Sequence, residues 1–241
     1  MTSHPTLADP LPAPRAPRAP AAEVAVPVWV RVALVVNVVA QVVIVVTGGL
    51  VRLTGSGLGC PTWPQCVPGS YVPVQHQAQG IHKYIEFGNR TLTGRVGLTA
   101  AVVLVAVWVV VRRDRRPRSL LLLAAVPFVG VVVQAVLGGI TVLTHLSPAT
   151  VAAHFLVSAG IVVASFAVLD RVRRPDGAAT WAVRPELQWL AYALATLTAV
   201  VLLLGTIVTG SGPHSGDAEA PARFGLDPRA MSWLHADTVM L

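Results

Sequence analysis

Four polar side chains between residues 82 and 93 are the first candidates for chemistry in this sequence. They follow i, i+4, i+7, i+11 spacing, which places them on one face of a helix: His82, Glu86, Asn89 and Thr93. The uncharged run that follows, 97–111, has 15 residues, whereas a membrane span needs about 20. The polar face is therefore predicted to enter the membrane, where ionisable groups are costly and usually functional.

Glu86 is the only acidic residue between Glu23 and Asp114. As a carboxylate at membrane depth, it is the leading candidate for a catalytic group. The alternative is an interfacial cap in which Glu86 pairs with Arg90 at i+4. That pair alone does not explain why so many polar groups share one face.

Histidines suggest a second kind of chemistry. His154 and His235 lie near the predicted outer ends of apolar helices, and His82 lies on the approach to another. Neutral imidazole is a common ligand of haem iron in helix bundles. A single buried histidine is more often only hydrogen-bonded, but several at matching depth beside a carboxylate favour a haem site. His145, in a short turn, is undecided.

Two cysteines, Cys60 and Cys66, lie six positions apart in a polar loop that is predicted to be external. An oxidising environment there favours a disulfide, and two free thiols are the alternative. A metal site would need more ligands. Covalent haem attachment would need a Cys-x-x-Cys-His motif, which is absent.

Composition places these residues in a membrane. Of the 241 residues, 54% are hydrophobic and 12% are charged, against about 25% charged in soluble domains. The net charge of +7 comes largely from arginine clusters between apolar runs, which suit topology rather than nucleic-acid binding. The sequence predicts an all-α integral membrane protein with no nucleic-acid partner.

The arginine clusters also divide the chain. We expect a disordered cytoplasmic tail at 1–27, a first four-helix transmembrane bundle at 28–170, a cytoplasmic loop at 171–185 and the start of a second bundle at 186–241. The predicted spans are 28–51, an extended helix reaching 111, 120–143, 149–169 and 187–208. The N-terminus is predicted to be cytoplasmic.

An internal repeat supports this division. The sequence Thr-Gly-Ser-Gly follows an apolar helix at 54–57 and again at 209–212. Reuse of a helix that ends in this turn suggests a duplicated membrane unit, pseudo-symmetric with the first. A complete second bundle would need two more helices, so the chain is predicted to be truncated at its C-terminus.

Three motifs carry a family resemblance. They are GGLVRLTGSGLGCPTWPQC at 48–66, IEFGNR at 85–90, and LGGITVLT at 137–144 followed by His154. Together they resemble the haem A synthase family of the actinobacterial type. The resemblance implies eight helices in two bundles and oxidation of a porphyrin methyl of haem O to the formyl group of haem A, for terminal oxidase biogenesis. It implies that haem O occupies the first bundle and a haem B cofactor the second.

The resemblance also implies roles for individual residues. Glu86 is the expected catalytic residue, Cys60 and Cys66 the disulfide, and His154 and His235 the iron ligands of substrate and cofactor haem. The remaining substrate-haem residues are Asn89, Arg90 and His82. Many members have histidine where this chain has Asn89, so His82 either compensates or only caps its helix. Arg90 or Arg52 is expected to pair with propionates.

Two other functions remain as alternatives. A membrane b-type dihaem electron carrier would also place histidines in helix bundles, but it needs no lone carboxylate. A transporter would also explain duplicated helices with buried polar groups. For the enzyme we expect location in the cell membrane, haem O synthase and an electron donor as partners, and a homo-oligomeric state.

Overall fold

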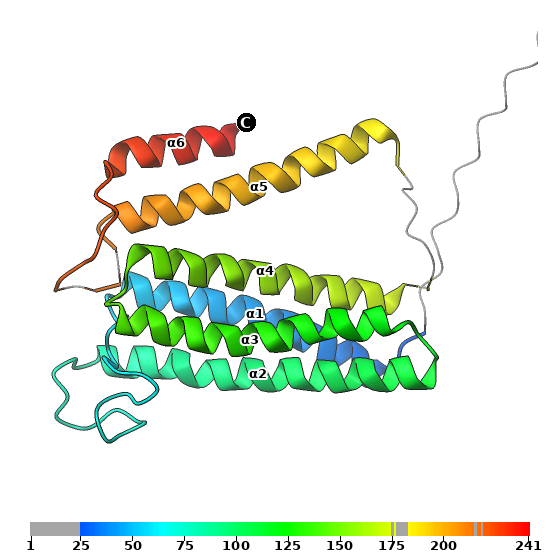
Figure 1. The fold of residues 1–241 in the computed structure, drawn as a ribbon, viewed down its shortest axis with the longest axis horizontal. Coiled ribbons are helices and arrows are strands. Elements are labelled where there is room, and N and C mark those ends of the chain that lie inside the picture. Colours follow the sequence, from blue (N-terminus) through cyan, green and yellow to red (C-terminus); the bar gives the residue numbers. More distant parts are fainter. Residues whose placement is uncertain (1–24, 175, 177–182, 215, 218) are drawn as a thin grey trace, which may run out of the picture.

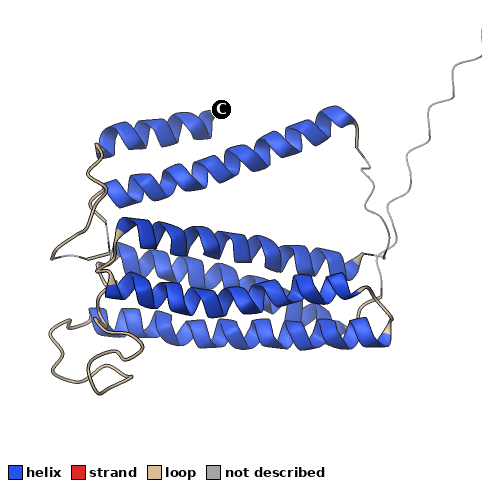
Figure 2. Cartoon of the chain, viewed as in Figure 1, coloured by secondary structure: helices blue, strands red, loops and turns tan. Residues whose placement is uncertain are grey.

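The computed structural model describes residues 25–174, 176, 183–214, 216, 217 and 219–241. The helices of this part are α1 (Val28–Leu53), α2 (His82–Arg113), α3 (Arg118–Leu143), α4 (Pro148–Arg173), α5 (Pro185–Ser211) and α6 (Pro228–Met240) (Figure 1). Apart from two isolated bridges, this part of the chain contains no β-structure (Figure 2). The predicted all-α class is confirmed. Most of the predicted tail and residues 177–182 of the predicted cytoplasmic loop lie outside the described residues.

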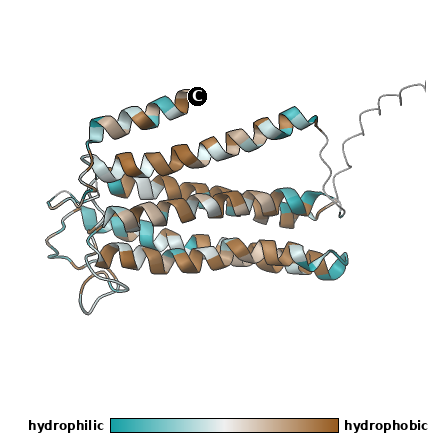
Figure 3. Ribbon diagram, turned by 45° about the horizontal axis from the view of Figure 1, so that its top comes forward, coloured by the Kyte–Doolittle hydropathy of each residue, from teal (hydrophilic) through white to brown (hydrophobic). Residues whose placement is uncertain are grey.

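Helices α1 to α5 are each long and apolar enough to span a membrane. They contain 26 to 32 residues, more than the roughly 20 that a bilayer core requires. Hydrophobic residues cover their middle portions, and hydrophilic residues gather toward the helix ends and in the loops (Figure 3). This distribution is typical of an integral membrane bundle.

Helices α1 to α4 form a four-helix bundle. α1 packs against α2 and α4, and α3 packs against the same two helices, so α1 and α3 are diagonal partners. The connections 54–81, 144–147 and 212–227 all lie at one end, here called the loop end (Figure 1). These connections set the depth at which each polar side chain enters the bundle.

The two halves of the bundle are filled differently. The main cluster of buried apolar side chains lies entirely in the half remote from the loop end and includes Leu34, Val107, Ala124 and Val168. The loop half contains the buried polar residues Glu86 and Gln134 instead. Apolar packing thus stabilises the far half of the bundle, and a binding site can form in the loop half.

Helix α2 begins where the sequence predicted that a span must include polar turns. Its 32 residues correspond to about 48 Å at 1.5 Å per residue. The polar stretch from His82 to Arg95 is helical throughout. The predicted polar face therefore exists as a continuous helical surface.

Helices α5 and α6, here called the second unit, follow the four-helix bundle, here called the first unit. α5 packs on α4, and α6 packs on α5. α5 approaches α4 most closely near the loop end and diverges from it toward the other end (Figure 1). None of the residues of α6 is buried.

Candidate functional site

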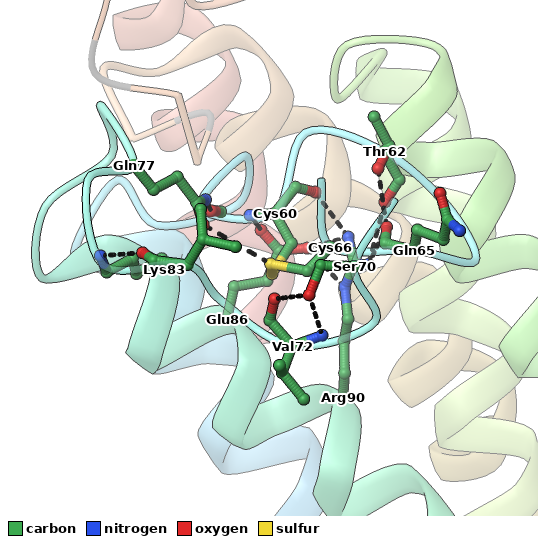
Figure 4. The surroundings of a disulfide bond; sticks show 12 residues. Cys60, Thr62, Gln65, Cys66, Ser70, Val72, Gln77, Lys83, Glu86 and Arg90 are labelled. Carbon is green, nitrogen blue, oxygen red and sulfur yellow. Dashed lines mark hydrogen bonds and ion pairs between the residues drawn. A yellow bond between two sulfur atoms is a disulfide. The ribbon is translucent and has the colours of Figure 1, made fainter. Parts of the chain in front are cut away.

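The loop after α1 is closed by a disulfide and held by a carboxylate. Cys60 and Cys66 are joined, and both are fully buried. Oε2 of Glu86 accepts a hydrogen bond of 2.6 Å from the backbone N–H of Cys60 (Figure 4). Glu86 is 5% exposed. The predicted catalytic carboxylate is thus buried beneath the disulfide loop.

Arg90 completes the attachment of this loop. Its Nε and Nη2 atoms donate to Oε1 of Glu86 at 2.9 and 2.5 Å. Nη1 donates to the carbonyl oxygens of Thr62 and Gln65, at 3.0 and 3.3 Å, and Nη2 donates to that of Cys60 at 2.6 Å (Figure 4). The i+4 ion pair weighed from the sequence exists, and it also binds three loop carbonyls.

His82 lies at the start of α2 and is hydrogen-bonded there. Its Nδ1 atom is 2.8 Å from Oγ of Ser56, which is fully buried and also bonds to Oγ1 of Thr54. A Cβ atom on Gly59 would overlap the backbone of His82, so glycine is needed for this close approach. His82 is not among the residues that line the cavities described next. His82 therefore ties the start of α2 to the turn after α1, and this geometry does not favour iron ligation.

Two adjoining cavities occupy the loop half. The larger has a volume of about 640 Å³ and reaches from α1 and α4 to α5 and α6. The smaller, of about 330 Å³, lies under Trp63 of the loop and is lined by Glu86 and Arg90. Both cavities are lined by Arg52, Asn89, Thr93, Gln134 and His154. Volumes of 300–1,000 Å³ are typical of ligand sites.

His154 and His235 each present an unpaired nitrogen in this region. The Nδ1 atoms of both are buried and have no hydrogen-bond partner among the described residues. Each imidazole lies beside a glycine of the preceding helix, Gly138 or Gly205. The sequence assigned these histidines to separate bundles, yet both line the larger cavity.

Asn89 stands on the predicted polar face and is not free. Its Oδ1 atom accepts a hydrogen bond of 2.8 Å from Thr47 of α1. Asn89 lines both cavities together with Thr93 of the same face. Of the four residues on the predicted polar face, Glu86, Asn89 and Thr93 line at least one cavity, whereas His82 lines neither.

Arg52 was a candidate from the sequence, whereas Gln134, Trp63 and Gly139 were not identified as site residues. Arg52 donates from Nη2 to the carbonyl of Thr209 at 2.7 Å, and its Nε atom is buried without a partner. Gln134 donates to the carbonyl of His154 at 2.8 Å. Trp63 packs so closely on Gly139 that a Cβ there would overlap its ring. Gln134 could have been found from the sequence, because it is a lone amide in an apolar run. Nothing in the sequence indicated the contact of Arg52 with Thr209 or that of Trp63 with Gly139.

Comparison with known proteins identifies the family. The model of the family described as "Cytochrome oxidase assembly protein" (COX15-CtaA) matches residues 31–215, and the chain belongs to this family. Combined with its five long apolar helices, this makes it a multi-pass membrane protein.

Curated relatives carry a more specific name. "Heme A synthase" of Bacillus mycoides (strain KBAB4) is 27% identical over 170 residues, covering 69% of this chain and 52% of the relative. "Heme A synthase" of Bacillus cereus (strain 03BB102) is 33% identical over 126 residues, covering 52% of this chain and 37% of the relative. The chain thus spans about half the length of the curated relatives that it matches. No solved structure matches.

Proposed function

We propose that this protein acts in haem A synthesis, oxidising a porphyrin methyl of haem O to the formyl group of haem A. The observation that carries the proposal is the convergence of an unpaired imidazole, His154, and a buried carboxylate, Glu86, on the adjoining cavities. A b-type electron carrier would need the imidazole but not the carboxylate. The name of the relatives points the same way.

His154 is the proposed ligand of the substrate iron. Its Nδ1 atom lacks a partner, and its backbone carbonyl is held by Gln134, which fixes that turn of α4. Asn89 lines the same space from α2, but an amide is a poor replacement for imidazole at iron. We propose that Asn89 lies beside the substrate haem without completing a second strong axial bond.

Arg52 is the proposed partner of the substrate propionates. All three guanidinium nitrogens of Arg90 already donate to Glu86 or to loop carbonyls. Arg52 lines both cavities and retains an unpaired buried Nε atom. Guanidinium matches the geometry of carboxylates, so the propionate edge should face this arginine at the loop end.

Glu86 is the proposed catalytic group. Haem iron supplies the redox chemistry, and the carboxylate stabilises positive charge at the oxidised carbon or relays its proton. Arg90 and the Cys60 amide hold both carboxylate oxygens in place. A carboxylate fixed in this way needs little reorganisation when charge develops beside it.

His235 is the proposed contribution of this chain to a haem B cofactor site. Its unpaired nitrogen lies in a cavity wall that α5 supplies with Val201, Leu202 and Gly205. An imidazole in apolar surroundings fits haem iron, which a bound cofactor would use to transfer electrons. We also propose haem O synthase and a membrane electron donor as partners, and a homo-oligomeric state.

For topology, we propose a cell-membrane protein with a cytoplasmic N-terminus and an external disulfide loop. The arginine clusters at 112–118 and 171–174 lie at the end opposite that loop. A membrane-impermeant maleimide should label Cys60 or Cys66 in intact cells only after reduction. Labelling that requires cell lysis would contradict this orientation.

The proposed function can be tested by analysing the haems in cells that make haem O and express this protein. We expect haem A or its hydroxymethyl precursor in membrane extracts separated by chromatography. The variant His154→Ala should lose both products and most of the bound substrate haem. His145→Asn is the matched control, because His145 is exposed and its positive φ of 49° suits asparagine. Bound haem without either product would favour the electron carrier instead.

A further inference from the structure

Two glutamines in the larger cavity have complementary unpaired atoms. Nε2 of Gln41 and Oε1 of Gln134 are both buried without a hydrogen-bond partner among the described residues. The residues are 4% and 8% exposed, and both line the cavity. Both side chains line the same cavity, and one holds an unpaired donor while the other holds an unpaired acceptor.

The orientation of Gln134 is determined by its neighbours. Its Nε2 atom donates to the backbone carbonyl of His154 at 2.8 Å and to the hydroxyl of Ser158. These two acceptors require nitrogen at that position, which directs Oε1 elsewhere. The unpaired acceptor thus follows from the surrounding hydrogen bonds.

Burying such groups without partners is costly, and nearly all buried polar groups in proteins are satisfied. Gln41 lies on α1 and Gln134 on α3, the diagonal pair of the bundle, so the space between them is the bundle interior. Neither group has a described partner in that space. A ligand group that can both accept and donate a hydrogen bond would satisfy both atoms.

Both amides lie deeper than Arg52, although Gln134, nine residues or about 14 Å from the end of α3, also lines the smaller cavity with Glu86 and Arg90. Gln41 is 12 residues from the end of α1, or about 18 Å, whereas His154 is six residues inside α4, or about 9 Å. Arg52 is next to the end of α1. The cavity therefore runs from a cation at the loop end, past an imidazole, to neutral amides deeper in the membrane.

We propose that Gln41 and Gln134 bind a hydroxyl group on the membrane-buried edge of the substrate porphyrin. A hydroxyl can accept from Nε2 of Gln41 and donate to Oε1 of Gln134, whereas a vinyl, methyl or formyl group cannot do both. The inference rests on the proposed function and specifies how that site selects its substrate.

Haem O carries such a hydroxyl on the carbon that joins its isoprenoid chain to the macrocycle, at the edge away from the propionates. With propionates at Arg52, that edge points toward the amides. Ile44, Val45, Val131 and Ile161 line the same cavity and offer an apolar surface to an isoprenoid chain. Gln41 and Gln134 thus become residues that distinguish haem O from haem B, which has a vinyl group at that position.

The test is a binding titration of purified protein, followed by haem absorption, with haem O, O-acetylated haem O and haem B. Wild-type protein should bind haem O most tightly, and acetylation should weaken binding because it removes the donor. In Gln41→Met, which keeps the side-chain length, affinity for haem O should fall about tenfold, while affinity for haem B is unchanged.

Asn37→Leu is the matched control. Asn37 is one turn deeper on the same face of α1 and 1% exposed, but it bonds to Thr99 and is not among the lining residues. Its replacement should leave the preference for haem O intact. Haem B binding to each variant reports whether it is folded.

Three results would overturn the inference while leaving the proposed function in place. These are equal binding of haem O and its acetylated form, an unchanged affinity of Gln41→Met for haem O, and equal weakening of haem O and haem B by that variant. Failure of wild-type protein to bind any haem would overturn the proposed function as well.

Discussion

The Thr-Gly-Ser-Gly sequence ends both α1 and α5, but its glycines have different tasks in the two places. Gly55 adopts a positive φ of 66°, a conformation that glycine reaches without steric cost. The equivalent Gly210 is still helical within α5, and a Cβ there would lie 2.5 Å from the ring of Phe224. At the first glycine of the motif, glycine is thus required for backbone conformation in Gly55 and for close packing in Gly210.

The serines of the two turns differ as well. Ser56 bonds to Thr54 and to His82, and thereby ties the turn to the following helix. Ser211 is equally buried, at 2% exposure, but its hydroxyl has no partner in the described part of the chain. The repeat thus retains the threonine hydrogen bonds to the preceding helical turn, which Thr54 and Thr209 both make, but not those of the serine.

The second turn is attached instead to the first unit. Arg52 donates to the carbonyl of Thr209, and the N–H of Gly57 donates to the carbonyl of Gly216 at 2.8 Å. In the first unit, Glu86 and Arg90 of the next helix hold the loop; in the second, α6 has no buried residue. The comparison shows that polar anchoring by a following helix is concentrated where the candidate site lies.

The largest expected effect comes from removing the charge of Glu86. Glu86→Gln keeps the size but sets an N–H against either Arg90 or the Cys60 amide, so some stability is lost and product yield is compared per molecule of folded, haem-bound protein. Haem A formation should fall by about 10²- to 10⁴-fold, a typical acid–base contribution, with accumulation of haem O or the hydroxymethyl intermediate. Chromatography of extracted haems measures this.

Glu219→Gln is the counterpart in the second loop, where Glu219 is exposed. It should leave product yield unchanged. Normal haem A yield from folded Glu86→Gln would remove the catalytic role and leave Glu86 as a loop anchor.

An intermediate effect is expected from Arg90→Met. This change strands the buried Glu86 carboxylate and frees three loop carbonyls, so the free energy of unfolding should fall by roughly 2–4 kcal/mol. Thermal unfolding in detergent measures the loss, and limited proteolysis should show earlier cleavage in 60–77.

Arg223→Met is the matched change in the second unit, where Arg223 donates to the carbonyl of Gly212. Its cost should be about 1 kcal/mol. Equal losses for the two arginines would show that both loops are anchored alike.

The smallest effects on stability are expected from replacing the serines of the two turns, Ser56 and Ser211. Ser56→Ala should lower the free energy of unfolding by about 1 kcal/mol, because it removes hydrogen bonds to Thr54 and His82. Ser211→Ala should be neutral or slightly stabilising, since that buried hydroxyl has no described partner. The same thermal measurement applies, and a larger loss at Ser211 would contradict the difference inferred between the turns.

Helix positions could be predicted from the sequence because apolar run length and bilayer thickness determine them. The start of α2 was also predictable, since residues 97–111 are too few to span and must be extended by the preceding polar turns. Asn37 and Gln41 lie four positions apart, so helical spacing puts them on one face, and both are buried.

Contacts between distant segments could not be predicted in this way. Nothing in the local spacing shows that Arg90 reaches the carbonyl of Cys60, thirty positions away, or that His82 meets Ser56. The common cavity of His154 and His235 depends on how α5 packs on α4. Such contacts arise from tertiary packing, and the periodicity of a single helix carries no information about them.

The way in which Arg90 holds the disulfide loop has a consequence for mutational tolerance. Arg90 binds backbone oxygens of Thr62 and Gln65, and every amino acid supplies such an oxygen. Saturation mutagenesis should therefore accept many residues at positions 62 and 65 but few at 86 and 90. Positions 62 and 65 can therefore vary more during evolution than Glu86 and Arg90, which hold the loop from beneath.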